Sequence, residues 1–134
     1  AGVYPAYHTL PHHGHKPERL TQLRLLANWR YKHLAHFLSL LKTYQGADNR
    51  PLIDTTAVLF GSGMSDASTH SSVNNPVMLM GGKFKHGNYH VLPNGKDGKK
   101  DTAYSNLLVT LQNSFGVEED KFSTSNGDLN HILT

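Results

Sequence analysis

Histidines are concentrated in the segment YHTLPHHGH, which runs from Tyr7 to His15. They occupy the positions His8, His12, His13 and His15. Imidazole is the commonest metal ligand in proteins, and several imidazoles on one short irregular segment can converge on a single ion. The mixed sequence around these histidines is unlike a homopolymeric purification tag. The pattern therefore predicts a metal-binding loop in which His12 or His13 binds together with His8 or His15, and a solvent-exposed loop is the alternative.

A second group of polar residues lies in GSGMSDASTHSSVNNP, residues 61–76, directly after an apolar run that is typical of a buried strand. In open α/β sheets, binding and catalytic groups gather at the carboxyl ends of strands, so Asp66 and His70 occupy positions where chemistry is expected. An aspartate and a histidine together suit a divalent transition metal. The alternative is a loop rich in glycine and serine in which Asp66 caps a turn.

The same loop offers a serine hydrolase as a further interpretation. Ser62 or Ser65 could form a triad with Asp66 and a loop histidine. The glycine spacing does not match the G-x-S-x-G elbow, because the sequence around Ser62 is Gly-Ser-Gly. The segment also lacks the Gly-Lys-Ser/Thr ending of a phosphate-binding Walker loop.

Of the five histidines outside these two segments, four are candidates of lower rank. His33 and His36 fall on a predicted helix, where we expect them to flank the apolar stripe or to face solvent. His86 and His90 are four residues apart, but the nearby glycines argue against the helix that would align them. We therefore expect a turn and a strand edge there.

Composition narrows the classes of function. The 134 residues fit one domain, residues 1–134, with 37% apolar and 17% charged residues. The absence of cysteine excludes thiolate nucleophiles and cysteine zinc sites. A net charge of +3 without a clustered basic face predicts no nucleic-acid partner. No apolar run approaches the roughly 18 residues of a transmembrane helix, so no membrane span is expected.

The elements that must position the candidate residues can be read from hydrophobic periodicity. Apolar residues recur at helical spacing along a long N-terminal segment and again near the C-terminus, and apolar runs bounded by turn residues predict strands between them. The predicted helices are Pro17–Gln45 and Thr102–Phe115, and the predicted strands are Thr56–Phe60, Pro76–Gly82 and a shorter Asn88–Leu92. This order predicts an α/β fold, with a sheet of two or three strands covered by the two helices.

The order of the motifs resembles a bacterial family catalogued as domain of unknown function 1552. The segments that carry this resemblance span nearly the whole chain: YHTLPHHGH, LIDTTAVLFGSGMSDASTHSSVNNPVMLMGG, YSNLLVTLQNSFGV and SNGDLNHIL. That family looks related to the alkaline phosphatase and sulfatase superfamily, whose members have an α/β fold and a hydrolytic site with two metal ions. The resemblance implies a partial alkaline-phosphatase-like sheet and the hydrolysis of phosphate or sulfate esters.

The resemblance also implies a set of metal ligands. In the related cofactor-independent phosphoglycerate mutases, a strand ends in an Asp-His-Gly metal motif and a further histidine follows. By this likeness Asp66 would bind one metal ion and His70 the other, with His12 or His13 in place of the upstream ligand pair. Two cations about 4 Å apart can clamp a tetrahedral anion. Zinc, manganese, iron and calcium are the divalent ions that we expect.

Three departures from the superfamily pattern limit what the chain is expected to do alone. Ala67 stands where the pattern has a histidine, the histidine-rich segment has no acidic ligand, and the N-terminal strand that carries the nucleophile is missing. The chain is therefore interpreted as a C-terminal portion that binds metal. Its expected partners are the missing N-terminal portion or other chains of an assembly, and the resemblance implies a periplasmic or extracellular location. The alternative is a non-catalytic metal-binding or structural module.

Overall fold

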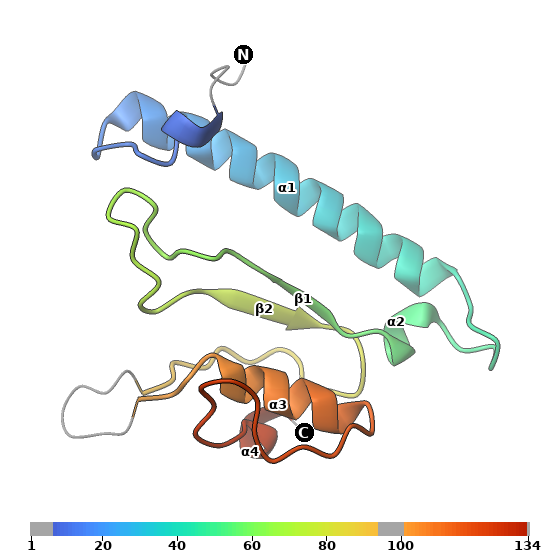
Figure 1. Cartoon of the computed structure of the whole chain (residues 1–134). Coiled ribbons are helices and arrows are strands. Elements are labelled where there is room, and N and C mark those ends of the chain that lie inside the picture. The colour runs from blue at the N-terminus through green and yellow to red at the C-terminus, as the bar shows by residue number, and fades with distance from the viewer. Residues whose placement is uncertain (1–6, 94–100, 134) are drawn as a thin grey trace. The chain divides into compact units, whose positions relative to one another are not determined.

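The computed structural model describes residues 7–93 and 101–133, and Figure 1 labels their helices and strands. Those residues belong to two compact units, which are described separately below. The first unit comprises the chain up to Ile53 together with Phe60–Val77, and the second comprises Asp54–Leu59 and the chain from Met78 onward. The elements in chain order are the 3-10 helix η1 (Tyr7–Thr9), α1 (Pro17–Thr43), α2 (Leu52–Thr55), β1 (Val58–Gly61), β2 (Val77–Met80), α3 (Ser105–Ser114) and α4 (Asn130–Leu133).

Helix α1 confirms the long helix predicted from the sequence and ends two residues earlier than expected. Pro17 occupies the first turn, where its missing N–H costs nothing, and Glu18 complements the positive end of the helix dipole. At the other end Tyr44 leaves the helical conformation, and its N–H donates to the Leu40 carbonyl at 2.9 Å. As with every other helix in the described ranges, α1 is not long and apolar enough to cross a membrane.

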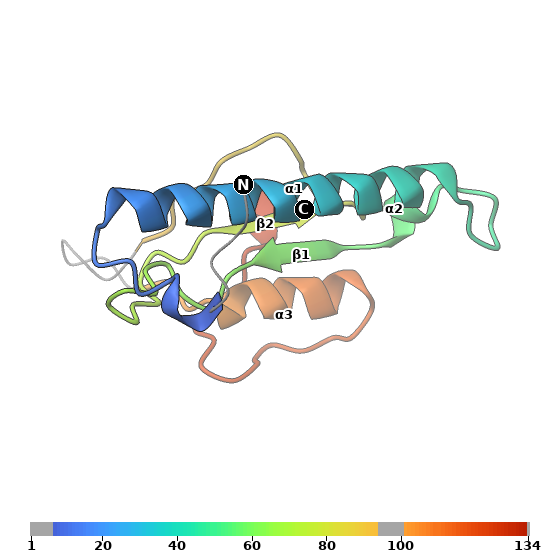
Figure 2. The ribbon, with the colours of Figure 1, turned by 90° about the horizontal axis from the view of Figure 1, so that it is seen from above.

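Strands β1 and β2 form a two-stranded antiparallel sheet, and Figure 2 shows their arrows pointing in opposite directions. Both strands were predicted, with bounds shifted by a few residues. Gly61 ends β1 at a point where only glycine fits. A Cβ atom there would lie 2.8 Å from Val77 Cγ1 and 3.1 Å from the Pro76 carbonyl oxygen. Together with the helices, this sheet makes the fold mixed α/β.

The third predicted strand, residues 88–92, is wrong, because this segment has no regular secondary structure. Tyr89 is 90% and Val91 81% exposed, while Leu92 at the end of the segment is 37% exposed. Aromatic and β-branched residues favour a strand chiefly when one face of it is buried against a neighbour. The residue types are those of a strand, but nothing in the described ranges covers the side chains of Tyr89 and Val91.

The second unit is organised around α3, which confirms the predicted C-terminal helix in shortened form. Its buried face is partly polar, and these polar groups hold the following segment in place. The Asn106 side chain exchanges two hydrogen bonds with Asn126, at 2.8 and 2.9 Å. Thr110 is fully buried, and its hydroxyl accepts the N–H of Leu129 at 2.7 Å. Leu107, Val109 and Leu129 supply buried apolar surface around these bonds.

Candidate functional site

Two segments that are distant in sequence meet in the first unit. One is the histidine segment, residues 8–15, and the other is the β1–β2 loop, residues 62–76. Leu10 is 2% exposed and anchors the histidine segment. Nη1 of Arg19, on α1, donates to the His12 carbonyl oxygen at 2.6 Å. The N–H of Gly14 donates to Ser68 Oγ of the β1–β2 loop at 3.3 Å, which joins the two segments directly.

Three imidazole rings are in contact at this junction. The rings of His12 and His70 meet edge to face, with their centroids 4.9 Å apart. The ring of His8 also meets that of His12 edge to face, with a centroid distance of 5.2 Å. Both contacts are within the range of ordinary aromatic pairs. Two of the four residues expected to bind metal, His12 and His70, are thus neighbours, together with the weaker candidate His8.

A second pair joins the same two segments. Nε2 of His13 lies 3.9 Å from Oδ1 of Asp66, and the His13 side chain is only 14% exposed. His15 lies beside His13, with a ring centroid distance of 5.2 Å. The backbone N–H of His15 donates to Nδ1 of His13 at 3.0 Å. All six histidine and aspartate candidates therefore lie at one junction, arranged in two groups.

Asp66 is held by its own turn as well as by its position beside His13. Its Oδ1 accepts the N–H of Ser68 at 2.8 Å, and its Oδ2 accepts the Thr69 hydroxyl at 3.0 Å. The backbone hydrogen bond from Ser68 is the main reason that the pKa of Asp66 lies below its ordinary value, followed by the Thr69 hydroxyl, with a smaller contribution from His13. The carboxylate is therefore ionised at neutral pH, and the turn-capping role considered from the sequence is present in the structure.

His70 is presented by a strained backbone. Its φ is +54°, in the left-handed region that glycine adopts without cost. The turn is closed by paired backbone hydrogen bonds between Asp66 and Ser71, and Asn74 further along the loop also has a φ of +57°. Residues other than glycine in this region cost about 1–3 kcal/mol and cluster at functional sites.

The β1–β2 loop is positioned in a different way from the one expected for an open α/β sheet. Asp66 and His70 were expected near the carboxyl end of a strand in an open α/β sheet. They do follow β1, but the sheet is antiparallel and has two strands, so the rule for parallel sheets does not explain their location. Their approach to the histidine segment instead comes from the length of the β1–β2 loop and the turn that Asp66 closes.

The two serines considered as nucleophiles hold the loop together. Ser65 donates its hydroxyl to the Ser71 carbonyl at 3.1 Å, and Ser62 Oγ accepts the N–H of Met64 at 3.3 Å. The Asn75 side chain donates to the Ser62 carbonyl and closes the base of the loop. These bonds give both serines a structural role in shaping the β1–β2 loop.

The lower-ranked histidines lie on α1 in the first unit and after β2 in the second unit. His33 and His36 are exposed on α1, as expected, and the ring of His33 packs on Trp29 at a centroid distance of 4.0 Å. Nε2 of His86 lies 3.0 Å from the Gly81 carbonyl oxygen. His90 is exposed, in a segment that was expected to be a strand edge and has no regular structure.

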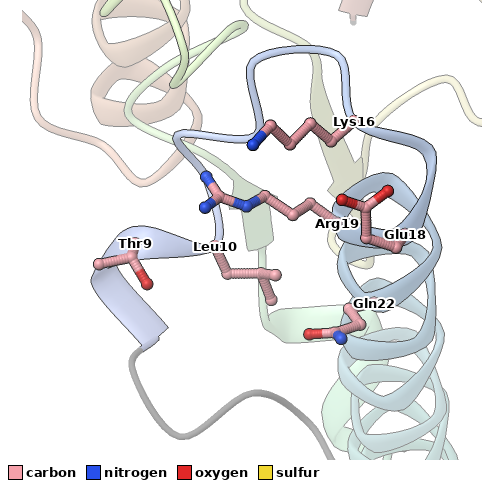
Figure 3. A pocket seen from close by; sticks show the side chains of 6 residues that line it. All are labelled: Thr9, Leu10, Lys16, Glu18, Arg19 and Gln22. Carbon is pink, nitrogen blue, oxygen red and sulfur yellow. The ribbon is translucent and has the colours of Figure 1, made fainter.

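A small pocket of about 190 Å³ lies beside the histidine segment, at the start of α1 (Figure 3). It is lined by Leu10 and by the side chains of Thr9, Lys16, Glu18, Arg19 and Gln22. Sequence reasoning missed Arg19 because nothing in the local pattern links it to His12. It also missed Ser68 and Thr69, although serine and threonine two and three residues after an aspartate are a known turn signal.

The residue types fit a divalent transition metal better than their placement does. Imidazole nitrogens and a carboxylate are suitable donors, and a carboxylate that accepts two hydrogen bonds keeps lone pairs for a metal. In the part of the chain that the structure describes, no group of three or more histidine, aspartate or glutamate side chains is arranged to hold an ion. The rings would therefore have to rotate about their side-chain torsions to converge.

Comparisons with known proteins gave no match to any family model, curated protein or solved structure. The resemblance to domain of unknown function 1552 stays a prediction, as does the alkaline-phosphatase-like form of the sheet. The geometry of the described residues is therefore the basis for a proposed function.

Proposed function

We propose that this chain provides the histidine-rich part of a divalent metal centre. The ligands would be His12, His13, Asp66 and His70, with His8 and His15 as neighbours that can join them. The observation that carries the proposal is the meeting of the histidine segment with the β1–β2 loop, where His12 contacts His70 and His13 approaches Asp66. The bound ion would be zinc, manganese, iron or calcium.

The backbone at His70 supports a role for its side chain. The turn is closed by Asp66 and Ser71 through backbone hydrogen bonds, which do not require an imidazole. Glycine would adopt a φ of +54° without strain, whereas histidine does so at a cost. A strained residue whose ring points at another histidine is more readily explained by chemistry than by folding.

The reaction that we propose for the complete centre is hydrolysis of a phosphate or sulfate ester, as the family resemblance implies. A bound metal would supply Lewis-acid polarisation of the ester oxygen. This chain would contribute the ligands, the ionised Asp66, and Arg19, which fixes the His12 backbone. We propose that the nucleophile comes from the N-terminal portion or from another chain, in a periplasmic or extracellular setting.

A second candidate is a non-catalytic module in which the same junction serves assembly. It is favoured by the hydrogen bonds that already join the segments, from Gly14 to Ser68 and from Arg19 to His12. In that case the histidine segment would bind metal alone or not at all. The role of His70 separates the two candidates.

The test is calorimetric titration of chelator-treated protein with zinc and manganese. We expect saturable binding by the parent chain and a loss of about tenfold or more in affinity for His70→Ala. His90→Ala is the matched control and should bind as the parent does, because His90 is exposed and belongs to the second unit. Unchanged binding by His70→Ala, with binding lost in the double variant His12→Ala/His13→Ala, would support the non-catalytic module.

A further inference from the structure

Helix α1 carries a line of large apolar side chains that remain in solvent. We call Leu25, Trp29, Phe37, Leu40 and Tyr44 the exposed stripe, and their exposures run from 38% to 61%. Their spacing of three, four and eight residues places them on one side of a helix. At 1.5 Å per residue, the stripe extends for about 28 Å along the axis.

The packing of α1 uses a neighbouring side of the helix that partly overlaps the exposed stripe. Leu23, Leu26, Leu34 and Leu38 are half-buried and Leu41 is buried, also at helical spacing. At 100° per residue, the centre of this set lies about 100° around the axis from the centre of the exposed stripe. The apolar surface of the helix is therefore wider than the part of it that is buried in the described structure.

Trp29 is the best anchor on the exposed stripe. It is 57% exposed, and its ring is oriented by contact with His33, whose Nδ1 lies 2.9 Å from the Trp29 carbonyl oxygen. Tyr44, at the end of the stripe, is 61% exposed. Tryptophan and tyrosine are enriched among the residues that dominate binding energy at protein interfaces. Large apolar side chains gathered on one exposed side of a helix mark an interaction site more often than single scattered ones do.

The charges on α1 indicate what kind of partner fits. The helix has five cationic residues and one acidic residue, Glu18. By helical spacing, Lys32 and Arg30 lie along opposite edges of the exposed stripe. Two copies of α1 packed on each other would bring like charges together, whereas acidic side chains on a partner would face opposite charges.

We propose that the exposed stripe docks an amphipathic helix of a partner protein, whose apolar residues are flanked by aspartate or glutamate. The apolar residues of that helix would cover Trp29, Phe37 and Leu40, and its acidic flanks would lie beside Arg30 and Lys32. This is the helix-in-groove mode of recognition, in which spaced apolar anchors give affinity and flanking charges give selectivity.

The test uses Trp29, which is the single tryptophan of the chain, as its own reporter. The probe is a designed helical peptide of about 20 residues, without tryptophan or tyrosine, with leucine at every third or fourth position and glutamate beside the leucines. We expect a blue shift of Trp29 emission, protection from iodide quenching and a Kd of about 1–100 µM. The same peptide with lysine in place of glutamate should bind at least about tenfold more weakly.

Matched variants show whether binding uses the proposed face. Lys32→Glu should lower the affinity for the glutamate peptide by about tenfold, and Phe37→Ser should lower it at least as much. Both variants should keep the helical circular dichroism of the parent. Lys83→Glu, in the second unit, is the control and should leave binding unchanged. No emission shift at about 100 µM peptide, or equal binding of the two peptides, overturns the proposal. Concentration-dependent dimerisation that Phe37→Ser abolishes would also overturn it, because the occupant would then be a second copy.

Discussion

The imidazole rings of His12 and His70 meet edge to face with their centroids 4.9 Å apart, although His12 precedes α1 and His70 follows β1. The contact is possible because Arg19 fixes the backbone of His12 and a strained turn presents His70. Beside it, His13 faces an aspartate that is kept ionised by its own turn. The junction thus combines imidazoles with a carboxylate, the donor set of a transition-metal site.

Replacing His70 by glycine should separate stability from function. The variant His70→Gly relieves the left-handed strain, so we expect the free energy of unfolding to stay constant or rise by about 1 kcal/mol. Zinc binding should nevertheless fall by about tenfold or more. Chemical denaturation and calorimetric titration measure the two effects. Asn74→Gly, which relieves similar strain in the same loop, should keep full zinc affinity; equal loss of affinity in both variants would assign the effect to loop flexibility.

Gly61→Ala should destabilise the protein, because the new Cβ would meet Val77 Cγ1 and the Pro76 carbonyl. Overpacking of this kind typically costs about 1–3 kcal/mol, which thermal and chemical unfolding can measure. Gly63→Ala serves as the control, since a Cβ there would have no atom within 4 Å. Equal stability of the two variants would mean that β1 and β2 do not approach as described.

Thr110→Val should cost about 1–3 kcal/mol of stability, since it keeps the side-chain shape but removes the acceptor for the Leu129 N–H. Thr110 is fully buried, so water cannot replace the lost bond. Thr21→Val on the exposed surface of α1 also removes a hydrogen-bonding hydroxyl and should change stability much less. A similar small effect at both positions would contradict the role given to Thr110 in the second unit.

Asp66 should make stability depend on pH in the acidic range. Its pKa is lowered in the folded state from an ordinary value of about 3.8, so in acid the unfolded state binds more protons than the folded state. The stabilisation that the ionised Asp66 carboxylate contributes is fully present above about pH 4, and it is lost as the pH falls through the pKa of Asp66 in the folded state. We therefore expect Asp66→Asn to be less stable than the parent at pH 7, with the difference shrinking below pH 4. Urea denaturation at each pH measures this; a difference that is constant from pH 7 to pH 3 would refute it.

The sequence predicted the helices of this protein better than its sheet. Pro17 and a long run of apolar residues at helical spacing predicted the bounds of α1 to within two residues, because these signals are local. The prediction of a strand at residues 88–92 is wrong because a strand forms only where a neighbouring element covers one of its faces. No local pattern contains that information.

The candidate site was predictable in composition but not in geometry. Residue types and the family resemblance singled out His12, His13, Asp66 and His70, and the structure places them at one junction. The ring orientations and the left-handed backbone of His70 depend on tertiary contacts. The same is true of the bond from Arg19 to His12, which joins residues that share no sequence signal.

The most direct test of the central claim is the metal content of the chain, measured by plasma mass spectrometry on protein purified without chelating resin or added metal. The proposed centre predicts about one or two equivalents of a divalent metal per chain, with a marked loss in His70→Ala. Less than about a tenth of an equivalent in a folded chain that takes up no added zinc or manganese would contradict it. The junction of the histidine segment with the β1–β2 loop would then be a structural contact.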